Sequence, residues 1–177
     1  TIVLDRSGSM GSIKDETITG FNVFLSGQQK AAGEATLTLA QFDHLYEVVY
    51  EARQLRDASP LNDDTYQPRG YTALLDAIGR TIGSTGARLA GSPESQRPDK
   101  VVFVILTDGL ENASKEFNTA RINEMIGQQR EVYKWEFVFL GANQDAIAIA
   151  SSMGIAQANA MTFTANVIGT HALYQSL

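Results

Sequence analysis

Three oxygen-bearing side chains stand at alternate positions near the start of the chain, in the order Asp5, Ser7 and Ser9. Carboxylate and hydroxyl oxygens are hard ligands that suit Mg²⁺ or Mn²⁺, and neither Cys nor His lies nearby to favour Zn²⁺. One carboxylate and two hydroxyls do not fill an octahedral site. The spacing therefore predicts part of a metal site, and the rest of the chain must supply the remainder.

A short strand is expected directly before these residues and a helix after them. Residues 1–4 are the apolar run of a buried strand, and Gly8 and Gly11 mark a tight loop. In an open α/β sheet, ligands bind outside the carboxyl ends of the strands. The three side chains are therefore expected at the ligand-binding edge. The alternative is a capped turn without metal, because Asp and Ser also favour such turns.

Two further stretches are expected to bring oxygen ligands to the same edge. Thr72 stands at the start of an expected helix, where its hydroxyl is either a helix cap or a ligand. Asp108 follows the apolar run 101–106, as expected at the end of a central buried strand, and Thr107 is expected to support it. With the first loop, these residues complete the predicted metal-binding set: Asp5, Ser7, Ser9, Thr72 and Asp108.

In the order and context of these residues, the sequence resembles the von Willebrand factor type A (VWA) domain. The metal-ion-dependent adhesion site (MIDAS) of that family has the pattern Asp-x-Ser-x-Ser, a distant Thr and a distant Asp, and all five positions match. The resemblance implies that Ser7 and Ser9 bind the metal directly, while Asp5 and Asp108 act mostly through water or hydroxyl groups. Thr72 would bind directly once the site is engaged. A partner protein's Asp or Glu carboxylate would then be the sixth ligand.

The rest of the chain alternates between expected strands and helices. Strands are expected at 1–4, 35–42, 45–55, 100–107, 135–140 and 160–164, and helices at 13–32, 72–89, 116–133, 145–153 and from 166 onward. The short turn Asp43-His44 predicts an antiparallel hairpin. The pattern is typical of an α/β fold: a doubly wound, mostly parallel six-stranded sheet with one antiparallel edge strand and helices on both faces. The resemblance implies the strand order 3-2-1-4-5-6.

Composition limits the classes of function. The 177 residues suffice for a sizeable core and are expected to form one domain, 1–177. A net charge of −6 without a basic run disfavours binding to nucleic acid or an acidic membrane. No apolar stretch approaches the ~20 residues of a membrane-spanning helix. The absence of Cys and of a visible signal favours a cytoplasmic location, although a chain that begins within a strand and without Met is expected to be trimmed.

Other polar residues near the expected site have simpler explanations. Asp43 either lies near the metal or stabilises its turn, and Asp76 is expected to bond to neighbouring loops from its helix. Neither His44 nor His171 stands in a pattern typical of a ligand or a base. These residues are therefore not included in the predicted metal site.

The segment 56–71 is expected to be a loop that delivers Thr72 to the site. Tyr66, Tyr71 and the pair 63–64 either flank the partner's footprint or belong to a solvated loop. In some VWA domains the last helix moves when the metal ligands exchange. The segment after Asn166 is therefore a candidate switch by resemblance.

The main alternative function is a Mg²⁺-dependent hydrolase. In phosphatases of the haloacid-dehalogenase type, an Asp after the first strand is the nucleophile, and here it would be Asp5. Those enzymes need a second Asp two residues on, where this chain has Ser7, and a Lys near the phosphate. Lys100 precedes its strand and so stands at the wrong end.

Two other functions are less favoured. A dinucleotide-binding enzyme would need a Gly-x-Gly-x-x-Gly motif after a strand, and none is present. The other alternative is a metal-free interaction scaffold that has kept the motif, and the intact ligand set argues against it. The sequence therefore predicts a non-enzymatic module that binds protein through a metal.

Overall fold

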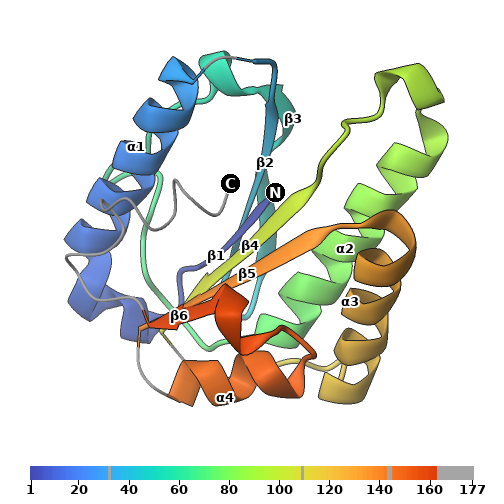
Figure 1. The fold of residues 1–177 in the computed structure, drawn as a ribbon. Coiled ribbons are helices and arrows are strands. Elements are labelled where there is room, and N and C mark those ends of the chain that lie inside the picture. The colour runs from blue at the N-terminus through green and yellow to red at the C-terminus, as the bar shows by residue number, and fades with distance from the viewer. Residues whose placement is uncertain (32, 109, 143–144, 163–177) are drawn as a thin grey trace.

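The computed structural model describes residues 1–31, 33–108, 110–142 and 145–162. Six strands form one sheet in the order β3-β2-β1-β4-β5-β6 (Figure 1). In chain order they are β1 Ile2–Asp5, β2 Thr36–Phe42, β3 Tyr46–Gln54, β4 Val102–Thr107, β5 Glu136–Gly141 and β6 Ala160–Thr162. β3 pairs antiparallel with β2, and the other pairs are parallel. The predicted sheet, its antiparallel edge strand and the implied strand order are confirmed.

Helices cover both faces of the sheet, as predicted. α1 (Lys14–Lys30) lies on one face, α2 (Leu74–Gly91) and α3 (Thr119–Tyr133) lie on the other, and α4 (Asp145–Ser152) follows β5 (Figure 1). A 3-10 helix, Gly8–Ile13, stands between the first loop and α1. The predicted terminal helix, residues 163–164 and His171 lie outside the described residues. That residues 1–177 form one domain stays a prediction.

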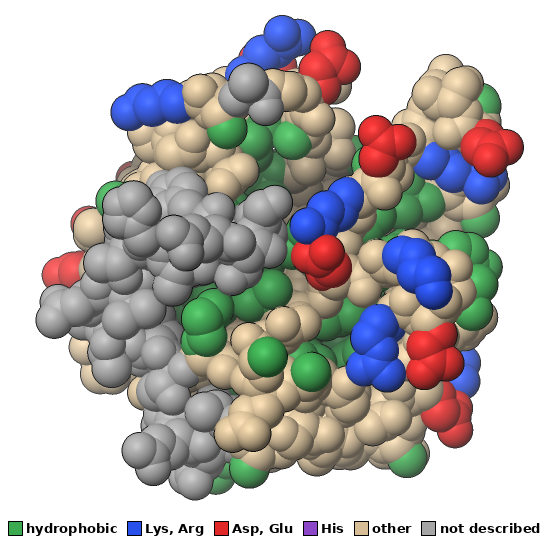
Figure 2. All heavy atoms as spheres, viewed as in Figure 1, with side chains coloured by type: hydrophobic (Ala, Val, Ile, Leu, Met, Phe, Trp, Pro, Cys, Tyr) green, Lys and Arg blue, Asp and Glu red, His purple; other side chains and the backbone are tan. Residues whose placement is uncertain are grey.

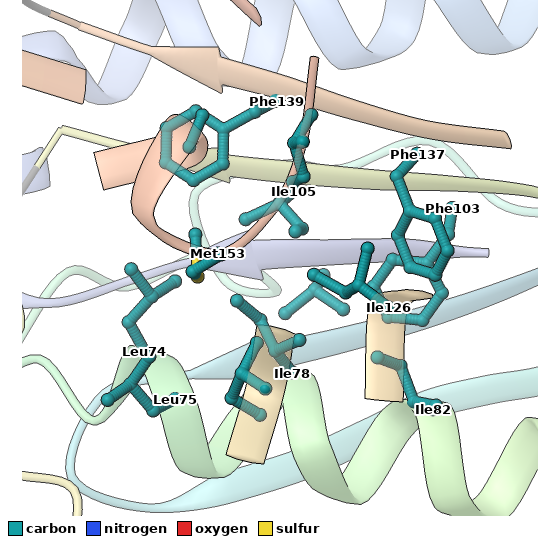
Figure 3. Close-up of a cluster of buried hydrophobic side chains, with 14 of the residues drawn as sticks. Leu74, Leu75, Ile78, Ile82, Phe103, Ile105, Ile126, Phe137, Phe139 and Met153 are labelled. Carbon is teal, nitrogen blue, oxygen red and sulfur yellow. The ribbon is translucent and has the colours of Figure 1, made fainter. Parts of the chain in front are cut away.

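The sheet separates two layers of core. Successive side chains of a strand point to opposite faces, so central strands that are covered on both sides consist of continuous apolar runs. Toward α2 and α3, one buried cluster includes Phe103, Ile105, Phe137, Phe139, Leu74, Leu75, Ile78, Ile82, Ile126 and Met153 (Figure 3). The opposite cluster includes Leu4, Leu106 and Leu140 of the sheet with Phe21 and Leu25 of α1. β1, β4 and β5 are therefore firm supports for the loops that follow them.

The strand register brings the carboxyl ends of three strands to the same level. Leu4 pairs with Leu106, and Asp5 pairs with Phe42. β1, β2 and β4 therefore end side by side. The segments that follow them, 6–13, 43–45 and 110–118, meet at one edge of the sheet.

Charged groups of both signs are interspersed on the surface. On the face in Figure 2, Lys and Arg side chains stand beside Asp and Glu side chains rather than in one positive area. Arg80 pairs with Glu116, and Lys100 pairs with Glu136. None of the described helices has the length and apolar character of a membrane span.

Candidate metal centre

The carboxylate of Asp5 is fixed at the end of β1. Its side chain is fully buried. Oδ1 accepts a hydrogen bond from the Ser7 amide at 2.6 Å, and Oδ2 accepts one from the Thr107 hydroxyl at 2.5 Å. The hydroxyl of Thr107 thus supports Asp5 on the neighbouring parallel strand, and the expectation that Thr107 supports Asp108 stays a prediction. Both oxygens of Asp5 are therefore oriented by the protein itself.

Two serine hydroxyls connect Asp5 to Asp108. Ser7 Oγ and Ser9 Oγ lie 3.2 Å apart, and Ser9 Oγ donates to Asp108 Oδ1 at 2.8 Å. Ser7 is buried, whereas Ser9 is exposed and Asp108 is half-buried. Four of the five predicted residues therefore form one hydrogen-bonded series of oxygen-bearing groups, which begins in the interior and ends at the surface.

Thr72 is positioned by its backbone. Its amide donates to Asn112 Oδ1 at 2.9 Å, and its carbonyl accepts from the amides of Asn112 and Ala113 at 3.0 and 3.1 Å. Thr72 therefore lies against the loop that follows Asp108. The helix-cap alternative is wrong, because α2 begins at Leu74 and its N-cap residue is Ala73. The Thr72 side chain is 3% exposed. Its role as a ligand stays a prediction.

The segment before Thr72 runs along the first loop. Arg69 donates its amide to the Arg6 carbonyl at 2.8 Å, and Gly8 donates its amide to the Gly70 carbonyl at 3.1 Å. Gly70 has φ +69, and a Cβ there would lie 2.2 Å from Nδ1 of His44. Only glycine fits this position without displacing His44. The close approach of the two backbones delivers Thr72 to the same edge as Ser7.

An ion cluster, which we call the Asp43 junction, consists of Asp43, Arg6 and Arg69. Asp43 Oδ2 accepts from Arg6 Nε at 3.1 Å and from Arg69 Nε at 3.0 Å, and its carbonyl accepts from the Ala73 amide at 3.0 Å. Asp43 is fully buried, and Arg6 is 7% exposed. Asp43 therefore stabilises its turn, which was one of the two roles expected for it. It also joins the segment that precedes Thr72 to the loop that contains Ser7. The sequence did not indicate that Arg6 and Arg69 take part.

Two acidic residues secure the other side of the site. Glu111 Oε2 accepts from the Leu75 amide at 3.0 Å, which fastens the start of α2 to the loop after Asp108. Asp76 accepts from the amides of residues 115–117, which confirms that it bonds to a neighbouring loop. This bonding keeps 115–117 out of the helix, and α3 therefore begins at Thr119 rather than at 116.

The two carboxylates of the candidate metal site both have raised pKa values. Burial raises the pKa of Asp5 to about 6, the charge of Asp108 adds to the rise, and hydrogen bonds from Thr107 and Ser7 oppose it. Burial also raises the pKa of Asp108, against the hydrogen bond from Ser9. The groups that bond to Asp5 are hydroxyls and an amide, without a cation. Two neighbouring carboxylates that resist ionisation are a favourable place for a divalent cation.

The remaining predictions on single residues are resolved as follows. Tyr66 is fully buried and donates its hydroxyl to the Asp5 carbonyl at 2.6 Å, so both alternatives for this residue, a partner's footprint and a solvated loop, are wrong. Tyr71, in contrast, is 70% exposed. His44 is half-exposed and lies beside Asp43. Lys100 stands before β4, at the opposite edge from Asp5. In the described part of the chain, no group of three or more His, Cys, Asp or Glu forms another metal site.

Comparison with solved structures identifies the fold. A proximal thread matrix protein from the mussel byssus, solved with zinc in its MIDAS motif, matches 95% of this chain with a TM-score of 0.68 at 11% sequence identity. The manganese-loaded TRAP protein of Plasmodium vivax matches 95% with a TM-score of 0.68 at 16% identity. A von Willebrand factor type A structure from Catenulispora acidiphila matches 95% with a TM-score of 0.58 at 14% identity.

The protein therefore has the VWA fold. The chain spans 44%, 68% and 39% of the length of those three proteins, in the same order. No protein-family model matches the sequence, and no curated protein matches it either. At these identities the likeness carries the fold, and a function for this chain must be argued from its own site.

Proposed function

We propose that this protein is a non-enzymatic module that binds a partner protein through a divalent cation of the Mg²⁺ or Mn²⁺ type. The observation that carries the proposal is the series of hydrogen-bonded oxygen groups at the carboxyl edge of the sheet, from Asp5 through Ser7 and Ser9 to Asp108. It contains a buried carboxylate whose hydrogen-bond donors are all neutral. Two proteins of the same fold were solved with zinc or manganese, which supports a metal here.

Each side chain of the site has a distinct proposed role. The hydroxyls of Ser7 and Ser9 offer neutral lone pairs, and the hydroxyl of Thr72 is available as a third. Asp5 orients Ser7 through its amide, and Asp108 accepts from Ser9, so both carboxylates act largely through other groups. A cation bound by mainly neutral ligands supplies an uncancelled positive charge and an open coordination position, which an Asp or Glu of a partner fits.

The same arrangement argues against phosphatase chemistry. A nucleophilic Asp5 would have to reach a substrate, but its side chain is fully buried and both oxygens already accept hydrogen bonds. Ser7 stands where such enzymes need an acid, and Lys100 stands at the opposite edge of the sheet. We therefore assign no catalytic residue.

Calorimetric titration of Mg²⁺ and Mn²⁺ into chelator-stripped protein tests the proposal. The wild type should bind either metal, and the double variant Ser7→Ala/Ser9→Ala should not, because it lacks both proposed direct ligands. Ser12→Ala is the matched control. It removes an exposed hydroxyl from the same loop, where Ser12 Oγ donates only to the Ser9 carbonyl. This variant should bind like the wild type.

Two results would contradict the proposal. Binding that persists in the double variant would place the metal elsewhere. No binding by the wild type would favour the metal-free scaffold instead.

A further inference from the structure

Large apolar side chains are exposed at the edge of the candidate metal centre. Tyr71 is 70% exposed and directly precedes Thr72, and Leu110 is 62% exposed and stands two residues after Asp108. Leu45, 54% exposed, lies in the turn between β2 and β3 at the same edge of the sheet. We call Leu45, Tyr71 and Leu110 the apolar rim. In the described part of the chain, the other exposed large apolar residues lie on α1, β3 and the end of α3: Val23, Val48, Val132 and Tyr133.

The backbone on both sides of Tyr71 is held in place. The Gly70 carbonyl accepts the Gly8 amide, and the amide and carbonyl of Thr72 both bond to Asn112. The Tyr71 ring meets the His44 ring edge-on, with centroids 6.5 Å apart. An aromatic side chain on a fixed backbone loses little conformational freedom when it is covered, which is typical of residues that dominate binding energy.

Charge at the rim favours an acidic partner segment. The Arg69 side chain is 53% exposed, its Nε bonds to Asp43, and it stands two residues before Tyr71. The whole chain carries a net charge of −6, so an acidic segment is repelled by the molecule as a whole. A divalent cation at the candidate metal centre would offset that repulsion locally.

We infer that the partner presents an Asp or Glu with large apolar side chains directly beside it, and that these side chains pack on the apolar rim while the carboxylate reaches the metal. This inference rests on the proposed function and specifies the class of partner. An acidic residue between small or polar neighbours would use the metal but leave Tyr71 and Leu110 in water. An acidic residue between aromatic or aliphatic neighbours would cover them.

Three blocked tripeptides test the inference on Mg²⁺-loaded protein by titration followed by NMR: Gly-Glu-Gly, Phe-Glu-Leu and Phe-Gln-Leu. Burial of part of two apolar side chains should make Phe-Glu-Leu bind about tenfold more tightly than Gly-Glu-Gly. Phe-Gln-Leu should bind far more weakly than Phe-Glu-Leu, because it has no carboxylate. A chelator should abolish the binding of both Glu peptides.

Two double variants test whether the preference for Phe-Glu-Leu over Gly-Glu-Gly depends on the apolar rim. Tyr71→Ser/Leu110→Ser should lower the affinity for Phe-Glu-Leu to that for Gly-Glu-Gly. Val132→Ser/Tyr133→Ser removes two equally exposed apolar residues from the end of α3 and should keep the tenfold preference. Thermal melting and Mg²⁺ titration of each variant check that it is folded and loaded.

The outcomes separate the inference from the proposed function. Equal affinities for the two Glu peptides, or a preference that survives in Tyr71→Ser/Leu110→Ser, would overturn the apolar rim and leave the metal-dependent function standing. Tight binding of Phe-Gln-Leu would overturn the pairing of rim and carboxylate. Failure of both Glu peptides to bind in a Mg²⁺-dependent way would overturn the proposed function, and the inference with it.

Discussion

Two buried carboxylates at one edge of the sheet, Asp43 and Asp5, have different electrostatic surroundings. At Asp43, burial opposes ionisation, but the Leu45 amide and the guanidinium groups of Arg69 and Arg6 outweigh it and lower the pKa. At Asp5, burial prevails over the hydrogen bonds from Thr107 and Ser7 and raises the pKa to about 6. The protein thus supplies cations to the carboxylate that joins its loops. It supplies only neutral donors to the carboxylate of the predicted metal site.

The difference separates a structural role from a binding role. A buried carboxylate that is paired with fixed cations is costly to remove, because its partners would be left uncompensated, and it has no charge left for a ligand. A buried carboxylate without a cation reduces stability until a cation arrives from outside. If this comparison is right, removing the charge of Asp43 and of Asp5 should change the stability of the metal-free protein in opposite directions.

The largest effect is expected from Asp43→Ala. This change removes the buried partner of the Arg6 guanidinium, which is 7% exposed and keeps only its ion pair with the exposed Glu47. Breaking a buried ion pair lowers the free energy of unfolding by about 3–5 kcal/mol, and the remaining pair with Glu47 should hold the loss to the lower part of that range. Urea denaturation in the presence of a chelator measures the loss. Asp63→Ala, whose side chain is 80% exposed and paired with Lys14, is the control and should cost less than about 1 kcal/mol. Similar losses in the two variants would refute the structural role of the Asp43 junction.

A smaller effect of opposite sign is expected from Asp5→Asn. An uncharged side chain of the same shape avoids the cost of the buried charge, so the metal-free variant should be more stable than the wild type near pH 7, by about 1–3 kcal/mol. The variant should also lose the stabilisation that Mg²⁺ gives the wild type. Urea denaturation with chelator and with Mg²⁺ measures both quantities.

The sign of the Asp5→Asn effect follows from how the free energy of unfolding depends on pH. The unfolded chain releases the Asp5 proton near its ordinary pKa of 3.8, whereas the folded protein holds it until about 6. Between these values the folded state binds more protons, so raising the pH lowers the free energy of unfolding. The advantage of Asp5→Asn in chelator should therefore grow as the pH rises from about 4 to about 7 and then level off. An advantage that is independent of pH would contradict the raised pKa of Asp5.

The sequence predicts the fold well because its information is local. The apolar run 101–106 is long enough for a strand that is buried on both faces, and the turn Asp43-His44 is too short for anything but a hairpin. Asp5, Ser7 and Ser9 are also defined locally, by a strand end and a glycine loop. These features needed no knowledge of distant contacts.

Contacts between distant segments of the chain could not be predicted from the sequence. Thr107 bonds to Asp5, 102 residues away along the chain, because β1 and β4 are neighbours in the sheet. Tyr66 belongs to a loop rich in polar residues, yet it is buried under the first loop and bonds to the Asp5 carbonyl. Arg6 and Asp43 meet only because β1 and β2 end side by side. Charge pairing of this kind follows from topology and not from residue spacing.

The smallest change in stability, and the sharpest test of the comparison, is expected from Arg69→Gln. The Arg69 side chain is 53% exposed, so losing its bond to Asp43 should cost at most about 1 kcal/mol of stability. The same change loosens the segment that carries Thr72, and changes just outside the ligands of a metal lower its affinity by about tenfold or more. Mg²⁺ titration should therefore show a clear loss of affinity in a protein whose denaturation midpoint has hardly moved.

Arg121→Gln is the matched control for Arg69→Gln. The Arg121 side chain is 59% exposed, and its ion pair with Glu124 lies within α3, outside the loops of the metal centre. It should cost a similar amount of stability and leave Mg²⁺ affinity unchanged. If both variants bind Mg²⁺ like the wild type, the Asp43 junction supports only the fold, and Thr72 is held by Asn112 and Ala113 alone. If only Arg69→Gln weakens binding, Asp43, which is neutralised by Arg6 and Arg69, also helps to position Thr72 as a ligand of the candidate metal centre.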